Sequence, residues 1–362
     1  MAEKEKTKKK IISDTESASG LKIAPVDQSV SRRRFLKCLS GAATSTLVLG
    51  ACATKQQSDP SDEPEGPTIL APRTKKSNPF VNAQGRPLLV CVSGTDYKTM
   101  LAAGLARLGG LSKLISAAQD VVINPNCNAA DPYPGISDAG FVVGIIDELK
   151  KVTSGTVSVA DQGYESAGAV YAFSGMDPAV TQAGAELVIM NDTYQVKREG
   201  WPLNATDIKV YKHIYDAPVL ISTCLIKRHH TATHTCTIKN NVGIVAGPGA
   251  ISTRHYLHYE ATNFSQALVE FAAASNPDLA IVDARTILTV GGPRFSDGVP
   301  VVVNKIILSG DIVSADLYCQ RILAAHDNEF GAETGGGLTE YANSIGLGSN
   351  DLNSLEIHEI TA

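Results

Sequence analysis

The stretch Val219–His258 reads VLISTCLIKRHHTATHTCTIKNNVGIVAGPGAISTRHYLH and joins an apolar segment to a histidine-rich one. Its first part, Val219–Leu225, is short and mostly apolar, which is typical of a buried strand. The remainder holds five of the eight histidines in the chain. Histidine titrates near neutrality and is the commonest metal ligand. The stretch therefore predicts a buried strand that leads directly into a functional site.

Apolar segments of strand length occur on both sides of this stretch, and segments with helical periodicity separate them. Phe141, Ile145 and Leu149 recur at helical spacing, and Asp138 precedes them as a suitable N-cap. The predicted strands are Leu88–Val92, Val121–Ile123, Val157–Ala160, Glu186–Met190, Val219–Leu225, Leu279–Asp283, Val301–Leu308 and, at a sheet edge, Leu355–Ile360. The predicted helices are Thr99–Leu108, Ala139–Lys151, Glu165–Phe173, Phe264–Ala274, Ser314–Ala325 and one that starts within Leu338–Ala342.

This alternation of apolar strands and helices predicts an α/β fold, with one or more largely parallel sheets covered by helices on both faces. Two lobes with a cleft between them are one way to arrange such a chain. In open sheets of this kind ligands bind beyond the carboxyl ends of the strands. Polar residues follow the predicted strands at such ends: Asn124 and Asn126, then Asp161, then Asp283. We therefore expect the site at that edge of the sheet.

The composition is that of an ordinary globular protein, with 43% hydrophobic and 19% charged residues among 362. Residues 1–51 carry ten Lys and Arg against five Asp and Glu, and the rest of the chain carries 22 against 32. A binding face for nucleic acid needs a basic footprint. The acidic balance of the main part therefore predicts no nucleic-acid partner.

The N-terminal 51 residues have the pattern of an export signal. Arg32 and Arg33 form a twin-arginine pair, and an apolar stretch, Cys38–Ala51, follows them. Leu49–Cys52 resembles a lipobox, which predicts cleavage before Cys52 and a lipid on its thiol. We therefore expect the twin-arginine export machinery as a partner, and a protein anchored to the membrane in the periplasm or cell envelope.

The residues after the lipobox divide into a tether and a folded part. Residues 52–85 are rich in Pro, Ser and charge, which is typical of a flexible linker. The folded domain is predicted over residues 86–362. Five cysteines remain after Cys38 and Cys52, so they cannot all pair internally, and no C-x-x-C supports an iron–sulfur cluster.

The histidine-rich stretch resembles the domain of unknown function 362 family. The resemblance rests on Lys227-x-His229, Thr235, Lys239-Asn240-x-x-Gly243 and His255, on Asn124-Pro125-Asn126, on the strand ends at Asp161 and Asp283, and on Gly310-Asp311 with Asp316. It covers roughly residues 88–325. Relatives have a lysine at the first position of the Asn124–Asn126 motif and a proline at Ile312. Many also carry a ferredoxin-like cysteine module, which this chain lacks.

The order of His229, Lys239 and His255 is also similar to that in lactate racemase, which uses a nickel-pincer cofactor. That likeness implies that Lys239 tethers an organic cofactor and that His255 binds the metal. We therefore predict His229, Lys239 and His255 as catalytic residues. Lys227, Asn240, Asn126 and Asp161 are the predicted ligand-binding residues.

A metal site is a separate expectation from the residues. If His230 and His234 lie on a helix, their spacing places both imidazoles on one face. His229, His255 or Cys236 can supply a third ligand, and we predict the set His230, His234 and His255. Imidazole suits Zn, Cu, Fe or Ni. The cofactor is left open between none and a transition metal or a metal-containing cofactor. H-E-x-x-H, G-x-G-x-x-G and Walker motifs are absent, so neither a zinc protease nor a nucleotide site is supported.

The sequence thus favours an enzyme or cofactor-handling protein that acts on a small anionic molecule in a His- and Lys-lined cleft. Lys227 and Lys239 suit the anion because a lysine in a cleft can clamp a negative group. The alternative is a non-catalytic lipoprotein that binds a metal or small ligand.

Overall fold

The computed structural model describes residues 68–163, 165–201, 208–247 and 252–362. The predicted export signal, Cys52 and most of the predicted tether lie outside these residues. Within the described ranges, none of the helices has both the length and the apolar character needed to cross a bilayer.

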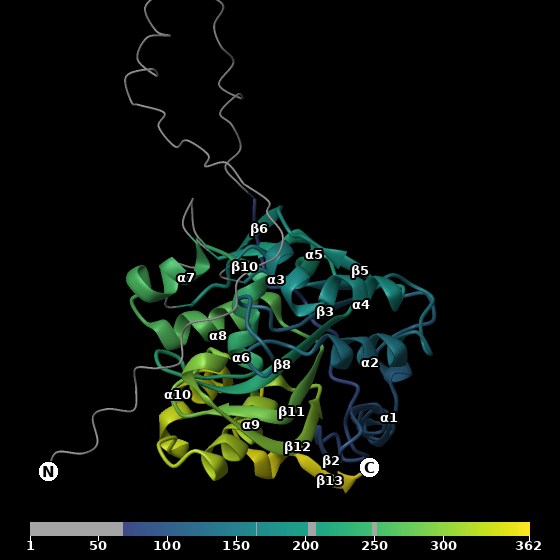
Figure 1. Ribbon diagram of the computed structural model, residues 1–362. Helices are drawn as coiled ribbons and strands as arrows, with labels where there is room; N and C mark the ends of the chain where they lie inside the picture. The colour runs from purple at the N-terminus through teal and green to yellow at the C-terminus, as the bar shows by residue number, and fades with distance from the viewer. Residues whose placement is uncertain (1–67, 164, 202–207, 248–251) are drawn as a thin grey trace, which may run out of the picture. The chain divides into compact units, whose positions relative to one another are not determined.

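Strands and helices alternate along most of the described chain (Figure 1). The strands are β1 (Ile69–Leu70), β2 (Leu88–Ser93), β3 (Val121–Asn124), β4 (Val157–Ala160), β5 (Glu186–Val188), β6 (Thr193–Val196), β7 (Lys209–Tyr211), β8 (Leu220–His229), β9 (Thr233–Thr235), β10 (Val245–Ala246), β11 (Leu279–Thr289), β12 (Val299–Ser309) and β13 (Glu356–Thr361). The α-helices are α1 (Tyr97–Leu108), α2 (Ala139–Leu149), α3 (Ala167–Ser174), α4 (Met176–Gln182), α5 (Lys212–Tyr215), α6 (Thr237–Asn240), α7 (Thr253–His255), α8 (Phe264–Ser275), α9 (Ile312–His326) and α10 (Ala332–Ser344). Short helical turns are η2 (Leu111–Lys113), η4 (Asn241–Ile244), η5 (Tyr256–Glu260), η6 (Phe295–Asp297) and η7 (Leu352–Ser354).

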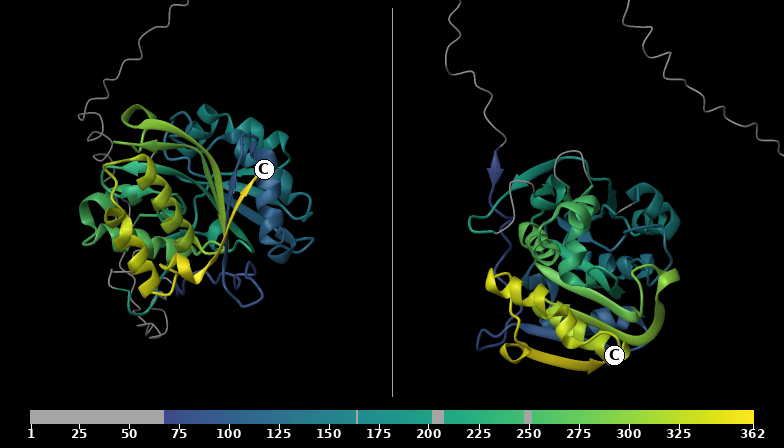
Figure 2. Two further views of the ribbon diagram at one scale, coloured as in Figure 1. Left: turned by 90° about the horizontal axis from the view of Figure 1, so that it is seen from below. Right: turned by 90° about the vertical axis from the view of Figure 1, so that its left-hand side faces the viewer.

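One large sheet organises the domain, in the order β13-β2-β12-β11-β8-β3-β4-β5, with β9 paired to β8. Neighbouring strands from β11 to β5 are parallel, and β12 runs against both of its neighbours. The C-terminal strand β13 lies beside β2 at the edge of the sheet, as both views of Figure 2 show. The predicted largely parallel sheet and its edge strand are confirmed.

Alternate side chains of the strands build a core on each face of this sheet. Ile221 and Ile281 belong to the core that α1, α2, α3 and α4 cover. Leu220 and Ala280, one residue earlier, belong to the core that α8 and α10 cover. Successive residues of a strand point to opposite faces, so strands buried on both faces are apolar almost throughout. In Figure 1, α1 and α2 lie to the right of the sheet and α8 and α10 to the left.

The folded domain begins earlier than the predicted boundary at residue 86. Phe80 is fully buried in the core under α1 and α2. The side chain of Arg73 is buried and its Nη2 lies 2.8 Å from Oδ2 of Asp278. The polar composition of this segment suggested a linker, but two of its residues are anchors. The described part of the predicted tether therefore belongs to the domain.

A smaller sheet, in the order β1-β6-β7-β10, was not predicted. Its strands are two to four residues long. Val196, Val210 and Val245 from this sheet pack into the core on the α8 side of the large sheet. These strands are short and mostly only partly buried, so they lack the continuous apolar run by which β3 and β4 were predicted.

Candidate functional site

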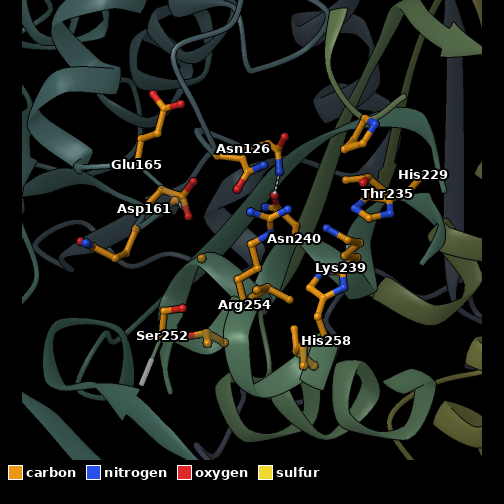
Figure 3. Close-up of a pocket in the computed structure, with 18 of the residues that line it drawn as sticks. Asn126, Asp161, Glu165, His229, Thr235, Lys239, Asn240, Ser252, Arg254 and His258 are labelled. Carbon is orange, nitrogen blue, oxygen red and sulfur yellow. Dashed lines mark hydrogen bonds between the residues drawn. The ribbon is translucent and has the colours of Figure 1, made fainter. Parts of the chain in front are cut away.

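A cavity of about 610 Å³ lies at the carboxyl ends of β4 and β8, where the strand pattern predicted the site. The lining comes from several elements and the loops between them. Figure 3 shows Asp161 and Glu165 on one side of it and His229, Lys239 and His258 on the other. Residues more than 90 positions apart in the chain thus meet in one place.

The hairpin from β8 to β9 fixes His229 in one protonation state. Its Nδ1 accepts hydrogen bonds from the backbone N–H groups of Thr231 and Ala232, at 3.1 and 3.0 Å. A nitrogen that accepts cannot also carry a proton, so the proton of the neutral ring lies on Nε2. Burial first, and then the charge of Lys239, lowers the pKa of His229 far below its usual range. His229 is therefore a neutral imidazole with an Nε2–H donor.

Lys239, on α6, lies between His229 and His258 in the view of Figure 3. Burial and the nearby guanidinium of Arg254 lower the pKa of Lys239 from 10.5 to about 8. Burial and the same guanidinium also lower the pKa of His258. Positive groups thus crowd one side of the cavity, and each disfavours the charge of the next.

A chain of buried amides connects the two sides of the site. Lys227 Nζ donates to Asn126 Oδ1 at 2.7 Å, and Asn126 Nδ2 donates to Asn240 Oδ1 at 3.0 Å. Asn240 Nδ2 then donates to Asn124 Oδ1 at 3.0 Å, and Asn124 Nδ2 donates to Asp161 Oδ1 at 3.1 Å. In each amide the oxygen accepts from one neighbour and the nitrogen donates to the next, which fixes the orientation of the amide.

Lys227 and Asp161 end this series of hydrogen bonds, and their pKa values are shifted in opposite directions. Burial, and next the charge of Lys239, lowers the pKa of Lys227 from 10.5 to about 7, although its Nζ also donates to the Gly135 carbonyl at 2.6 Å. Burial raises the pKa of Asp161 to about 7, against the hydrogen bond that its Oδ2 accepts from the Cys127 N–H at 2.6 Å. Both groups titrate near neutrality, which is common at functional sites.

The wall of the cavity contains one buried hydroxyl without a partner. Thr235 Oγ1 has no hydrogen-bond partner within the described chain. Thr235 pairs with Lys227 across the β8–β9 hairpin. An unpartnered buried polar group costs free energy. Thr235 belongs to the motif that carries the family resemblance, but it was not among the predicted catalytic, ligand-binding or metal-binding residues. Glu165 was also not predicted as a lining residue, because it reads as the start of a helix.

Two of the three predicted catalytic residues come together, and the third does not. His229 and Lys239 line the cavity. The side chain of His255 is half exposed on α7, and its Nε2 lies 3.4 Å from Oε1 of Glu260. His258, one helical turn later, is the histidine of this segment that lines the cavity. The predicted ligand-binding residues Lys227, Asn240, Asn126 and Asp161 all line it.

The predicted metal set of His230, His234 and His255 is not assembled in this structure. The helix expected over His230–His234 is wrong, since β8 ends at His229 and β9 begins at Thr233. His234 turns into the interior, where its Nε2 lies 2.6 Å from Asp316 and its Nδ1 lies 3.0 Å from Thr233 Oγ1. No group of three or more metal-binding side chains is found in the described ranges.

Two aspartates at predicted strand ends serve the fold. Asp283 lies within β11 and forms a buried ion pair with Arg285 at 2.7 Å. Asp311 caps α9 by accepting from the N–H groups of Val313 and Ser314. Neither lines the cavity.

Among curated proteins, the chain is similar to the thylakoid-associated protein sll1697 of Synechocystis sp. The two are 25% identical over 222 residues, which cover 60% of this chain and 67% of the relative. Among solved structures, it is similar to the lactate racemase apoprotein from Thermoanaerobacterium thermosaccharolyticum, with a TM-score of 0.43 and 12% identity. That match covers 70% of this chain, and this chain spans 61% of that structure.

The strand-end polar residues, the β8–β9 hairpin and α6 all fall within one family match. The model described as Domain of unknown function (DUF362) matches residues 121–321, more than half of the chain. This range is narrower than the predicted resemblance over residues 88–325, but it contains the whole of the His- and Lys-rich motif. The chain therefore belongs to the DUF362 family.

Proposed function

We propose that this protein binds a small anionic molecule in the cavity between Asp161 and Lys239, and acts on it as an enzyme or as a protein that handles a cofactor. One observation carries the proposal: a neutral histidine donor and a lysine of lowered pKa line the same cavity. The remaining steps follow from the charges and the fixed proton of His229.

The electrostatics favour a negatively charged ligand. The charge of Arg254 disfavours that of Lys239, and this repulsion is relieved when an anion lies between them. On the far side, the raised pKa of Asp161 leaves much of that carboxyl neutral near pH 7. Glu165 is offset by Arg294, 3.6 Å away. The Lys239 side of the cavity is therefore the positive one.

His229 suits the role of a hydrogen-bond donor better than that of a base. A pKa far below the usual range means that its ring holds a second proton only weakly. Its Nε2–H can stabilise negative charge that develops on an oxygen of the ligand. Lys239, with a pKa of about 8, is partly neutral near pH 7 and can accept a proton or form a covalent bond to a carbonyl carbon.

A metal does not enter this scheme. The donor set predicted for it does not fit, because His234 uses both ring nitrogens in the interior and His255 lies outside the cavity lining. No step is assigned to a metal or a metal-containing cofactor.

We also propose that the protein is exported and lipid-anchored. The twin-arginine pair and the lipobox at Cys52 support this part, and both lie outside the described residues. Mass spectrometry of the protein from its native membrane tests it. A diacylglyceryl mass on Cys52 is expected, and an unmodified chain that still begins at Met1 is the result against it.

The function is tested first by elemental analysis and intact mass of the exported protein. A stoichiometric metal contradicts the metal-free scheme, and added mass on Lys239 identifies a tethered cofactor. Small carboxylates and phosphate esters are then screened for an increase in melting temperature. We expect His229→Ala to abolish turnover of the best ligand and to weaken its binding by less than about tenfold.

One control variant and two outcomes decide between the alternatives. Lys98→Gln removes an exposed lysine on α1, far along the chain from the cavity lining, and binding is expected to be unchanged. If His229→Ala lowers affinity and the wild-type protein converts none of its ligands, the protein is the non-catalytic binding lipoprotein of the alternative. If no anion binds the wild-type protein, the proposal is wrong.

A further inference from the structure

A second cavity, of about 480 Å³, shares no lining residue with the first. The segment Pro72–Asn78 forms one wall, and Arg198 and Trp201 lie on another. Arg73, in this wall, donates to the carbonyls of Ala217 and Asn276, which precede β8 and β11. The cavity is therefore near the amino ends of these strands. Lys227 lies seven residues along β8 from Leu220, roughly 23 Å away at about 3.3 Å per residue.

The lining residues of this second cavity include four cations and no carboxylate. Arg73 has a charged partner, Asp278, at 2.8 Å. The other three donate to uncharged acceptors: Lys75 to the Gly310 carbonyl at 3.0 Å, Lys76 to the Leu114 carbonyl at 2.8 Å and to Gln119 Oε1 at 2.7 Å, and Arg198 to the Ile345 carbonyl at 2.7 Å. Carbonyl groups satisfy hydrogen bonds but leave the positive charge in place.

Two buried donors in the wall are also without partners. Arg73 Nε and Trp201 Nε1 have no hydrogen-bond partner in the part of the chain that the structure describes. Their residues are only 4% and 8% exposed. A buried N–H group without a partner costs free energy. Burial lowers the pKa of Lys75, against the attraction of the nearby carboxylates of Asp311 and Asp278.

We propose that this cavity binds a phosphate group, held by Lys75 and Arg198, with the unpartnered N–H groups of Arg73 and Trp201 as further donors. A phosphate oxyanion has three or more acceptor oxygens, which matches this number of donors better than the two oxygens of a carboxylate. Arginine is well suited to phosphate because its planar guanidinium donates in a fixed fork. The group can come from a soluble phosphate ester or from a phospholipid headgroup. Pro72 follows the predicted lipid site Cys52 by only 20 positions, which allows the second source.

Trp201 is the only tryptophan in the chain, so the fluorescence of the full-length protein reports directly on this cavity. The protein is titrated with inorganic phosphate and glycerol 3-phosphate, and separately with vesicles of phosphatidylglycerol or of phosphatidylcholine. We expect a saturable change in fluorescence. A response to the soluble phosphates identifies a soluble ligand. A response to vesicles alone, stronger for phosphatidylglycerol, identifies a headgroup.

Two variants test the residues. Arg198→Gln is expected to weaken binding at least tenfold, and Lys98→Gln, which removes an exposed lysine elsewhere, is expected to leave it unchanged. Trp201→Phe keeps an aromatic ring and removes the N–H, and its weaker binding is measured by calorimetry. The inference is overturned if none of the four probes gives a saturable signal. It is equally overturned if Arg198→Gln binds as tightly as the wild-type protein.

Discussion

The surroundings of Lys239 disfavour its positive charge and therefore lower the stability of the folded protein. Its ammonium group is held next to Arg254 in a partly buried wall, so the folded state disfavours the charge that the unfolded chain accommodates freely. Such arrangements persist where a ligand needs them. Because the pKa of Lys239 differs between the folded and the unfolded chain, the stability of the protein depends on pH.

We predict that Lys239→Met raises the free energy of unfolding at pH 7 by about 1–2 kcal/mol, after a discount for partial exposure. The pKa of Lys239 is lowered to about 8 in the fold from 10.5, so the cost of its charge is present below pH 8. It disappears between pH 8 and 10.5, and the gain from the substitution should disappear with it. Urea unfolding at pH 7 and pH 10.5 measures this. A loss of stability at pH 7 would contradict it.

The histidines show what a sequence pattern can establish at this scale. The family motif indicated Lys227 and His229 as site residues, and the side chains of both line one cavity. The metal set failed because it assumed a helix. Thr233 instead adopts a left-handed conformation, with φ of 62°, at the turn of a hairpin. Nothing in the local sequence announces that turn, and it sends His234 into the interior.

At the scale of elements, α9 supports the strand and helix beneath the cavity, β9 and α6, through the carboxylate of Asp316. Asp316 accepts hydrogen bonds from His234 at 2.6 Å, from Thr237 Oγ1 at 3.1 Å and from the Ile238 N–H at 3.0 Å. These contacts join α9 to β9 and to the first turn of α6, which carries Lys239. Asp316 thus positions the catalytic candidate without touching the cavity.

We predict that Asp316→Asn lowers the free energy of unfolding by about 3 kcal/mol, because it breaks a buried ion pair. The pKa of Asp316 is lowered from 3.8 and that of His234 is raised from 6.5. The pair therefore contributes fully between about pH 4 and 6.5, and less as the pH rises through the raised pKa of His234. Urea unfolding at pH 5.5 and pH 9 compares the two conditions. Asp147→Asn, an exposed change on α2, is the control; equal effects of the two substitutions would refute the prediction.

The turn η4 requires glycine at one position, where it passes Asp161. A Cβ atom on Gly243 would lie 1.8 Å from Asp161 Oδ1. We predict that Gly243→Ala destabilises the protein by about 2 kcal/mol or more and weakens ligand binding, because Asp161 must move. Gly168→Ala on α3 has no atom within 4 Å of the new Cβ, and should stabilise by about 0.5–1 kcal/mol. Thermal melts of both variants test the pair, and similar shifts would count against it.

Strands that are buried along their whole length, and helices with a clear buried stripe, could be predicted, and short strands that are only partly buried could not. The strand β3 is buried along its whole length, with three apolar residues followed by Asn124. The helix α2 has buried apolar residues at helical spacing. The strands β6, β7 and β10 gain their stability from pairing with each other and from the α8 core. That information lies in contacts distant in the chain, which a single sequence does not display.

At the scale of the whole molecule, the parallel strands determine where the sites lie. Because β3, β4 and β8 run the same way, Asn126, Asp161 and Lys227 emerge at one edge. The same geometry places Arg73 and the second cavity near the opposite ends of β8 and β11. The strand order could not be read from the sequence, because apolar strands of similar length can pair in many orders.

The segment of residues 68–85 closes that opposite end, which gives a prediction for truncated chains. A chain that begins at residue 86 loses Phe80 from the core and leaves Asp278 buried without Arg73. Loss of a buried ion-pair partner costs about 3–5 kcal/mol, and removal of a buried phenyl ring costs about as much. Together they approach the total stability of a typical domain. We therefore expect residues 86–362 not to melt cooperatively by circular dichroism, and residues 68–362 to melt like residues 52–362. Identical cooperative melts for all three chains would restore the linker interpretation of residues 68–85.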